Sequence, residues 1–160
     1  MIIRPAKQDD IIEIGQMWIE LIAYHRELDP DMPAPVSDGA QRYAERMRYG
    51  LDDSYFRICV AQEDDTLLGY VFGTIIDLLP ETFQAERAGM IGDIFVRSSY
   101  RHRGVGQALM AAMKDWFRLR GVSHYEWYVA SANEPAIHFW RETMGGKAVM
   151  IRMRAPIDDV

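Results

Sequence analysis

Apolar residues in the first fifty positions recur at helical spacing. A short apolar run at residues 1–6 reads as a strand, and apolar residues then lie three, four and seven positions apart. This spacing places them on one face of a helix. A helix ending before Pro30 and a second helix near residues 40–51 are therefore predicted. The two apolar faces are Ile11, Ile14, Trp18, Leu21 and Leu28, followed by Ala40, Tyr43, Ala44, Met47 and Leu51.

The rest of the chain alternates between strand-like apolar runs and helical patterns. Two runs joined by the turn EDDT predict a β-hairpin, and three further runs predict single strands. A glycine-bearing turn opens an amphipathic helix with Leu119 on its buried face, and Asn133 is suited to cap a last helix. The predicted strands are residues 55–62, 67–80, 89–96, 123–130 and 147–153, and the predicted helices here are about 104–120 and the segment after 133.

This order of elements predicts a single α/β domain over residues 1–160. Strands interleaved with helices, with a hairpin in the first half, form a mixed sheet with helices on its faces. The length of 160 residues suits one domain with a sizeable core.

Composition and charge narrow the possible functions. The net charge is −6, which argues against nucleic acid as the main partner, because binding a polyanion relies on clustered Lys and Arg. The single cysteine, Cys59, excludes an internal disulfide and reads as a buried structural thiol. Four scattered histidines suggest no metal site. With no signal peptide and no apolar run long enough to cross a membrane, we expect a cytoplasmic protein without a membrane partner.

The segment RHRGVGQAL carries the first chemical signal. It follows the apolar strand at 89–96 and opens directly into a helix, whose N-terminus presents free N–H groups and a partial positive charge. Gly104 and Gly106 would let the backbone approach a phosphate closely. The Walker ending and the third glycine of the dinucleotide fingerprint are both missing.

This segment resembles the acyl-CoA loop of the GNAT superfamily of N-acyltransferases. Their pattern, Gln/Arg-x-x-Gly-x-Gly/Ala, is matched at residues 101–106. The block NEPAIHFW at residues 133–140 is similar to the superfamily's Asn-x-x-Ala-x-x-Phe-Tyr helix, most closely to that of diamine acetyltransferases. The resemblance implies the GNAT fold, a central mixed sheet that splays apart to admit the cofactor.

The resemblance also implies a cofactor, acetyl-CoA, and a set of residues that bind it. The backbone of Ile94, Phe95 and Val96 would pair with the pantetheine arm, and an amide at or near Val96 would stabilise the oxyanion. Backbone amides of the loop would cradle the pyrophosphate, and residues of the second block would line the pantetheine. The loop residues are Arg101, His102, Arg103, Gly104, Val105, Gly106 and Gln107, and those of the second block are Asn133, Ala136, Phe139 and Trp140.

Two features of the superfamily's catalytic machinery are absent. Trp140 replaces the tyrosine that usually acts as general acid, and indole N–H cannot protonate a thiolate. We therefore expect Trp140 to pack against CoA or against the core. Gly92 replaces an acidic residue of the diamine acetyltransferases, so polyamine specificity is not inherited. The remaining catalytic candidates are Asp93 as base, with Glu126 and Tyr128 as base and acid on one face of the fifth strand.

The acceptor candidates lie after the first predicted helix. In the superfamily this region covers the acceptor site, so Tyr24, His25, Asp29 and Asp31 would select the substrate, and Glu81 and Glu86 offer a second polar segment. The leading hypothesis is direct acetyl transfer from acetyl-CoA to a primary amine of a small molecule or peptide. The alternative is an acetyl-CoA-binding sensor or scaffold with little or no catalysis. A homodimer is common in the superfamily.

Overall fold

The structure is a computed structural model that describes residues 1–77, 82–155 and 157. Five strands form one open sheet in the order β1-β2-β3-β4-β5, in which only the β4–β5 pair is parallel. The strands are β1 (Ile2–Pro5), β2 (Phe56–Glu63), β3 (Thr66–Asp77), β4 (Arg87–Val96) and β5 (Tyr125–Trp127). The helices are α1 (Ile11–Leu28), α2 (Gly39–Gly50), α3 (Val105–Leu119) and α4 (Glu134–His138), which continues as a π-helical turn over Phe139–Thr143. Short 3-10 turns lie at Gln8–Asp10 and Ser98–Tyr100.

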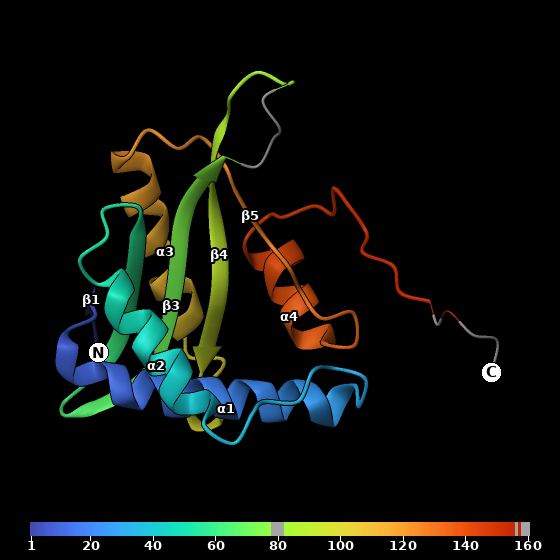
Figure 1. Cartoon of the computed structure of the whole chain (residues 1–160). Helices are drawn as coiled ribbons and strands as arrows, with labels where there is room; N and C mark the ends of the chain where they lie inside the picture. The colour runs from blue at the N-terminus through green and yellow to red at the C-terminus, as the bar shows by residue number, and fades with distance from the viewer. Residues whose placement is uncertain (78–81, 156, 158–160) are drawn as a thin grey trace.

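Helices cover both faces of this sheet (Figure 1). Helix α3 packs on one face through an apolar stripe that includes Leu109 and Met113, both fully buried. Helices α1 and α2 pack on the other face, where Ile14 and Met47 are also fully buried. The predicted mixed α/β sheet is thus confirmed, since each amphipathic stripe buries its apolar side chains against a sheet face.

A β-bulge interrupts β4 at Gly92. The pairing with β3 runs regularly to Gly73 and Ile91, then resumes at Phe72 and Asp93, leaving Gly92 as the extra residue. Without the bulge, Ile91 and Asp93 would point to the same face. With it, Ile91 packs on the α3 side, whereas Asp93 points to the α1–α2 side.

The bulge coincides with the point where β4 and β5 part. Their last paired residues are Ile91 and Trp127, directly before Gly92. A bulge bends a strand and increases its twist, so β4 turns away from β5 at this point. The splayed sheet expected from the resemblance is therefore present, and helix α4 lies beside the open part of β4 in Figure 1.

The predicted last strand is wrong for this chain. Residues 147–153 form no strand, and the segment extends away from the rest of the molecule in Figure 1. The predicted fifth strand is also shorter, three residues instead of eight, because β5 has only β4 as a partner and loses it after Trp127. Leu119 was expected on the buried face of α3, but as the last residue of that helix it is 85% exposed. Part of the predicted strand 67–80 lies outside the described residues.

Within the described ranges, no helix has both the length and the apolar character needed to cross a membrane. Cys59 is buried, as predicted, and burial raises the pKa of its thiol to about 11.

Candidate active site

The open part of β4 presents backbone amides toward the gap that no neighbouring strand pairs with. The amide of Arg97 bonds the Leu68 carbonyl of β3 at 2.9 Å, and amides alternate direction along a strand. The peptide groups of Ile94 and Val96 therefore point away from β3, to the side that β5 has left. The backbone of Phe95 points to β3 and its side chain is buried under α1 and α2. Of the three residues expected to pair with a pantetheine arm, the geometry suits two.

The loop at the end of β4 turns the chain into helix α3. Gly104 is the N-cap residue with φ +79°, and its carbonyl accepts the amide of Ala108 at 2.9 Å. This is the first hydrogen bond of the helix, so the amides of Val105, Gly106 and Gln107 have no carbonyl before them in the helix. His102 also adopts a positive φ, 60°, which L-residues rarely do. The loop therefore aims a row of N–H groups outward, as an anion site requires.

Both glycines of this loop leave room that a side chain would fill. A Cβ at Gly106 would lie 3.6 Å from the Phe139 ring and 4.0 Å from a Val96 methyl, at the mouth of the gap. A Cβ at Gly104 would meet only the Gln107 side chain, at 3.7 Å. The free amides and the open edge of β4 thus adjoin a space that the backbone keeps clear, and these residues fit the phosphate and pantetheine parts of a CoA thioester.

Arg101 does not take the position expected for a phosphate ligand. Its amide bonds the Ser98 carbonyl at 3.3 Å, and its Nε donates to the Val96 carbonyl at 2.9 Å. The guanidinium also lies 4.8 Å from the centroid of the Tyr24 ring. Arg101 therefore ties the end of α1 to the end of β4, whereas His102 and Arg103 are exposed on the loop.

The second block is split between the gap and the core. Asn133 is buried and caps α4, because its side chain accepts the amide of Ala136 at 3.2 Å. Phe139 and Ala136 are partly buried and face the same cluster as Val96. Trp140 is 5% exposed and stacks on Trp127 with ring centroids 4.4 Å apart. Of the two environments expected for Trp140, CoA or the core, the structure shows packing in the core.

Asp93 lies at the centre of a polar cluster on the α1–α2 face. Tyr43 of α2 donates a hydrogen bond to its carboxylate at 2.9 Å, and the hydroxyl of Tyr70 in β3 lies 3.2 Å from that of Tyr43. Burial raises the pKa of both tyrosines well above the ordinary value, so both stay protonated. Tyr43 uses its hydroxyl proton in the hydrogen bond to Asp93, so its oxygen accepts a hydrogen bond from Tyr70. Two hydroxyl donors in series thus end at one carboxylate.

Two further groups act on Asp93 electrostatically. His25 of α1 and Arg46 of α2 are close enough for their charges to favour the carboxylate, but burial outweighs them and raises the pKa of Asp93. Burial likewise lowers the pKa of His25, against the pull of Asp93, so His25 is neutral at pH 7. His25, which the sequence predicts as an acceptor-site residue, thus interacts electrostatically with Asp93, the predicted base.

The sequence did not single out Tyr43, Tyr70 or Arg46 as functional. Tyr43 was assigned to the apolar face of its helix, where it is indeed buried and stacked on Trp18. The sequence signal for a polar role of Tyr43 is its hydroxyl group, because a buried tyrosine hydroxyl needs a hydrogen-bond partner. The bulge that brings Asp93 to this face is not visible in the sequence.

The other predicted site residues lie at the margins. Tyr128 follows β5 and is 78% exposed, and Glu126 is partly exposed with its carboxylate 3.9 Å from His124. The carboxylate of Asp29 accepts the amide of Asp31, so this pair stabilises its own loop. Glu86 lies 3.4 Å from His124 across the start of the β4–β5 pair, and Glu81 lies outside the described residues.

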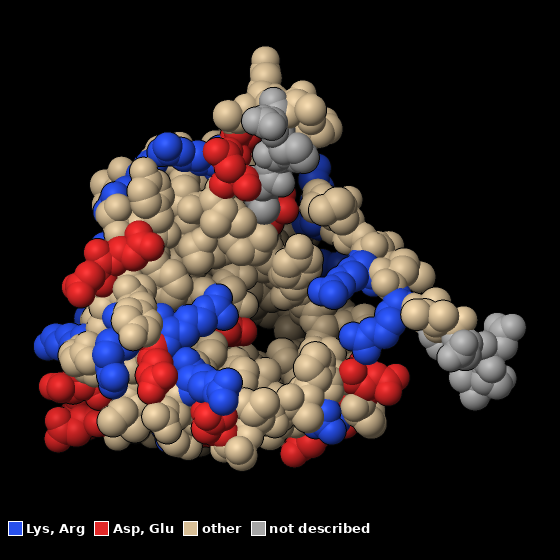
Figure 2. Space-filling model, in the orientation of Figure 1, with Lys and Arg blue, Asp and Glu red and all other residues tan. Residues whose placement is uncertain are grey.

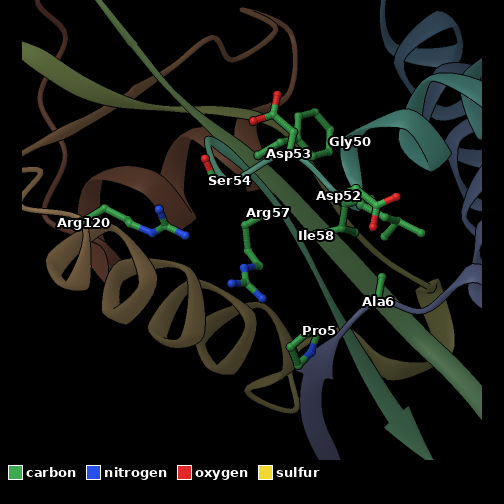
Figure 3. A pocket seen from close by; sticks show the side chains of 11 residues that line it. Pro5, Ala6, Gly50, Asp52, Asp53, Ser54, Arg57, Ile58 and Arg120 are labelled. Atoms are coloured by element: carbon green, nitrogen blue, oxygen red, sulfur yellow. The ribbon is translucent and has the colours of Figure 1, made fainter.

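The visible face of the molecule in Figure 2 is hollowed. Figure 2 shows a depression in the middle of the visible face, between the open part of β4 and helix α4, above α1. A separate pocket lies at the ends of α2 and α3 and is lined by Asp52, Ser54, Arg57 and Arg120, among others (Figure 3). It contains none of the predicted site residues. No group of three metal-binding side chains occurs within the described part of the chain.

Comparison with known families agrees with this geometry. The model of the acetyltransferase (GNAT) family matches residues 21–145, most of the chain, including the loop and the second block. The chain belongs to the GNAT acetyltransferase family. A solved structure of a mutant Bacillus halodurans protein superposes on this GNAT protein with a TM-score of 0.87, at 20% identity over 98% of this chain and 99% of the other.

Two further matches are to named enzymes. An aminoglycoside acetyltransferase from an uncultured soil metagenomic sample gives a TM-score of 0.68 at 16% identity, over 98% of this chain and 96% of the other, which shows a shared fold. An L-ornithine N5-acetyltransferase from Arabidopsis thaliana is 38% identical over 66 residues, or 41% of this chain. This GNAT protein spans 28% of the length of that curated relative.

Proposed function

We propose that this GNAT protein transfers an acetyl group directly from acetyl-CoA to a primary amine of a small molecule or peptide. The observation that carries the proposal is the open edge of β4, directly beside the free amides at the start of α3. The ornithine N5-acetyltransferase, whose name specifies a side-chain amine, supports a small-molecule acceptor.

The proposed mechanism assigns each residue a separate task. Bound acetyl-CoA supplies an activated acetyl thioester. Ile94 and Val96 hold the pantetheine arm as an added strand, and one of their amides donates to the carbonyl oxygen as negative charge develops there. The backbone amides of residues 102–107 hold the pyrophosphate. The Arg101 amide takes no part, because it donates to the Ser98 carbonyl.

Asp93 receives the proton that the acceptor nitrogen loses. A bound CoA thioester would supply the acetyl group and a thiolate leaving group, and the acylated nitrogen would then give its proton to the Asp93 carboxylate. Tyr43 holds that carboxylate in place. An acceptor amine has an ordinary pKa of about 10.4, so neutral His25 beside Asp93 is a second group able to take a proton before attack.

A glycine substitution tests the cofactor site. In Gly106→Leu the side chain extends toward Phe139 and Val96 and fills the mouth of the gap. We expect the affinity for acetyl-CoA, measured by calorimetry, to fall by at least about 100-fold, or roughly 2.7 kcal/mol. Ala111→Leu, at an exposed position on the same helix, is the matched control and should bind normally. Normal binding by Gly106→Leu would refute the site.

The acetyl-CoA sensor or scaffold remains the second candidate, favoured by the burial of Trp140 in the core. A panel of amines, ornithine and aminoglycosides included, separates the two by release of free CoA. Tight acetyl-CoA binding without turnover on any amine would favour the sensor.

A further inference from the structure

Arg57 places a charged side chain on the face of β2 that packs under α3. Side chains alternate along a strand, so Arg57 lies on the same face as Cys59, which is buried in the core beneath α3. Its guanidinium lies 5.7 Å from the centroid of the Trp116 ring, in the last turn of α3. A charged group at the border of an apolar core needs a partner that receives its protons.

Among the described residues, no group supplies that partner. The Nε atom of Arg57 is buried and has no hydrogen-bond acceptor. A buried donor left without a partner costs about 1–3 kcal/mol, and more when it is charged. The ion pairs between described residues involve other side chains, so no carboxylate neutralises the Arg57 guanidinium.

Arg120 brings a second guanidinium to the same place. This residue ends helix α3 and, together with Arg57 and Ser54, lines a pocket of about 220 Å³. Figure 3 shows the two arginine side chains entering this pocket from β2 and from the end of α3. Arg120 also forms no ion pair with a described residue. Two like charges in one pocket repel each other, and an anion between them would remove that repulsion.

Two aspartates also line the pocket, but they do not neutralise the arginines. Asp53 accepts the amide of Tyr55 at 2.8 Å, so its carboxylate stabilises its own turn. Asp52 is exposed, and in Figure 3 both carboxylates point away from Arg57. The Ser54 hydroxyl adds a further hydrogen-bond donor to the lining. The space between the arginines is therefore rich in donors and lacks an acceptor.

We propose that this pocket binds a small oxyanion, a phosphate or a dicarboxylate, between Arg57 and Arg120. A guanidinium presents paired N–H donors that match two oxygens of either group, and both kinds of anion have enough oxygens to bridge two arginines. The pocket is smaller than the roughly 300–1,000 Å³ of sites for drug-sized ligands, so it does not suit acetyl-CoA. It contains no residue of the proposed cofactor site and is a separate site.

Calorimetry with inorganic phosphate and with succinate, at an ionic strength held constant with sodium chloride, tests this site. We expect one anion to bind per chain with a Kd below about 10 mM, and the tighter of the two probes identifies the class. Arg57→Gln and Arg120→Gln should each weaken binding at least about tenfold, because each removes one of the two guanidiniums. Arg118→Gln, which removes an exposed charge from the same helix end, is the matched control and should bind normally.

Two further variants separate this site from a folding defect and from the glycine loop. Arg57→Lys keeps the charge near Trp116 but lacks the paired donors, so it should fold normally by circular dichroism and still bind more weakly. Gly106→Leu should bind the anion as the unmodified protein does. Binding that is lost in Gly106→Leu but retained in both Arg57→Gln and Arg120→Gln would place the anion at the start of α3 and overturn the proposal. The absence of saturable binding by either probe would overturn it as well.

Discussion

At the scale of single residues, Asp93 is a buried carboxylate for which we propose a catalytic role. Its carboxylate is held by Tyr43, backed by Tyr70, and influenced by His25 and Arg46. Burial raises the pKa of Asp93, which is the direction that turns a carboxylate into a better proton acceptor. A purely structural carboxylate would gain nothing from this shift.

Replacing Asp93 separates a catalytic from a structural role. We expect Asp93→Asn to lower kcat/KM by about 100-fold, because the proton acceptor is lost while the amide still accepts from Tyr43. In Tyr43→Phe the carboxylate loses its donor, so its pKa should rise and the acid limb of the kcat/KM profile should move to higher pH. Gln41→Ala, exposed on the same helix, is the control. Full activity of Asp93→Asn across the pH range would assign Asp93 to packing.

Gly92 and Phe72 form a second residue-scale pair. A Cβ at Gly92 would overlap the ring of Phe72, so no side chain fits there while that ring is in place. This overlap explains in physical terms why an acidic residue is absent at this position.

The pair should behave cooperatively in unfolding experiments. Gly92→Ala is expected to lower the free energy of unfolding by about 2–3 kcal/mol through overpacking. Adding Phe72→Leu should recover part of this loss, because the smaller side chain vacates the space. Urea unfolding of the two single variants and the double variant gives the coupling energy. Strictly additive losses would mean that the two residues do not compete for space.

At the scale of elements, the sequence predicted what alternation and helical spacing encode. Helices α1, α2 and α3 follow from one buried face each, and the β2–β3 hairpin follows from two apolar runs joined by a turn. The bulge at Gly92 could not be predicted, because it is a property of the register between β3 and β4, which the sequence of one strand does not specify. The strand predicted at residues 147–153 is absent, because strand propensity does not supply a neighbouring strand to pair with.

The parts of the candidate site that are local in sequence could be predicted, and those that depend on contacts between distant elements could not. The glycine loop is local in sequence, so its position at the start of α3 could be read directly. The cluster around Asp93 joins α1, α2, β3 and β4, and only the folded chain brings these together. The sequence left Trp140 between CoA and the core, and only the folded chain shows that its stacking partner is Trp127.

At the scale of the whole molecule, one ion pair joins the first strand of the sheet to the start of helix α1. Arg4 of β1 donates to both carboxylate oxygens of Asp10, at 2.7 and 2.9 Å, and the Lys7 amide donates at 2.6 Å. Burial alone would raise the pKa of Asp10, but these hydrogen bonds outweigh it and the pKa is lowered.

This pair gives the protein an acid-sensitive contribution to stability. A carboxyl group with a lowered folded pKa stabilises the fold above its unfolded pKa, about 3.9, and that contribution is lost as the pH falls toward the folded pKa. Asp10→Asn should lower the free energy of unfolding at pH 7 by about 2 kcal/mol and flatten its decline below pH 4. Asp38→Asn, which breaks an exposed pair with Arg42, should leave both unchanged. Equal declines in acid for Asp10→Asn and the unmodified protein would contradict this assignment.

Deleting Gly92, the extra residue in β4, should affect the fold and the proposed cofactor site differently. Removing Gly92 would leave Ile91 and Asp93 on the faces they already occupy, because a bulge adds one residue without changing the alternation on either side. Removing Ile91 or Asp93 would instead move Gly92 into the vacated position, and the chain would lose a side chain of the core or of the polar cluster. The shortened chain could thus keep both cores, but its straightened strand would continue alongside β5 and close the gap. We therefore expect the fold to tolerate the loss of this one residue, whereas the proposed cofactor site would not survive it.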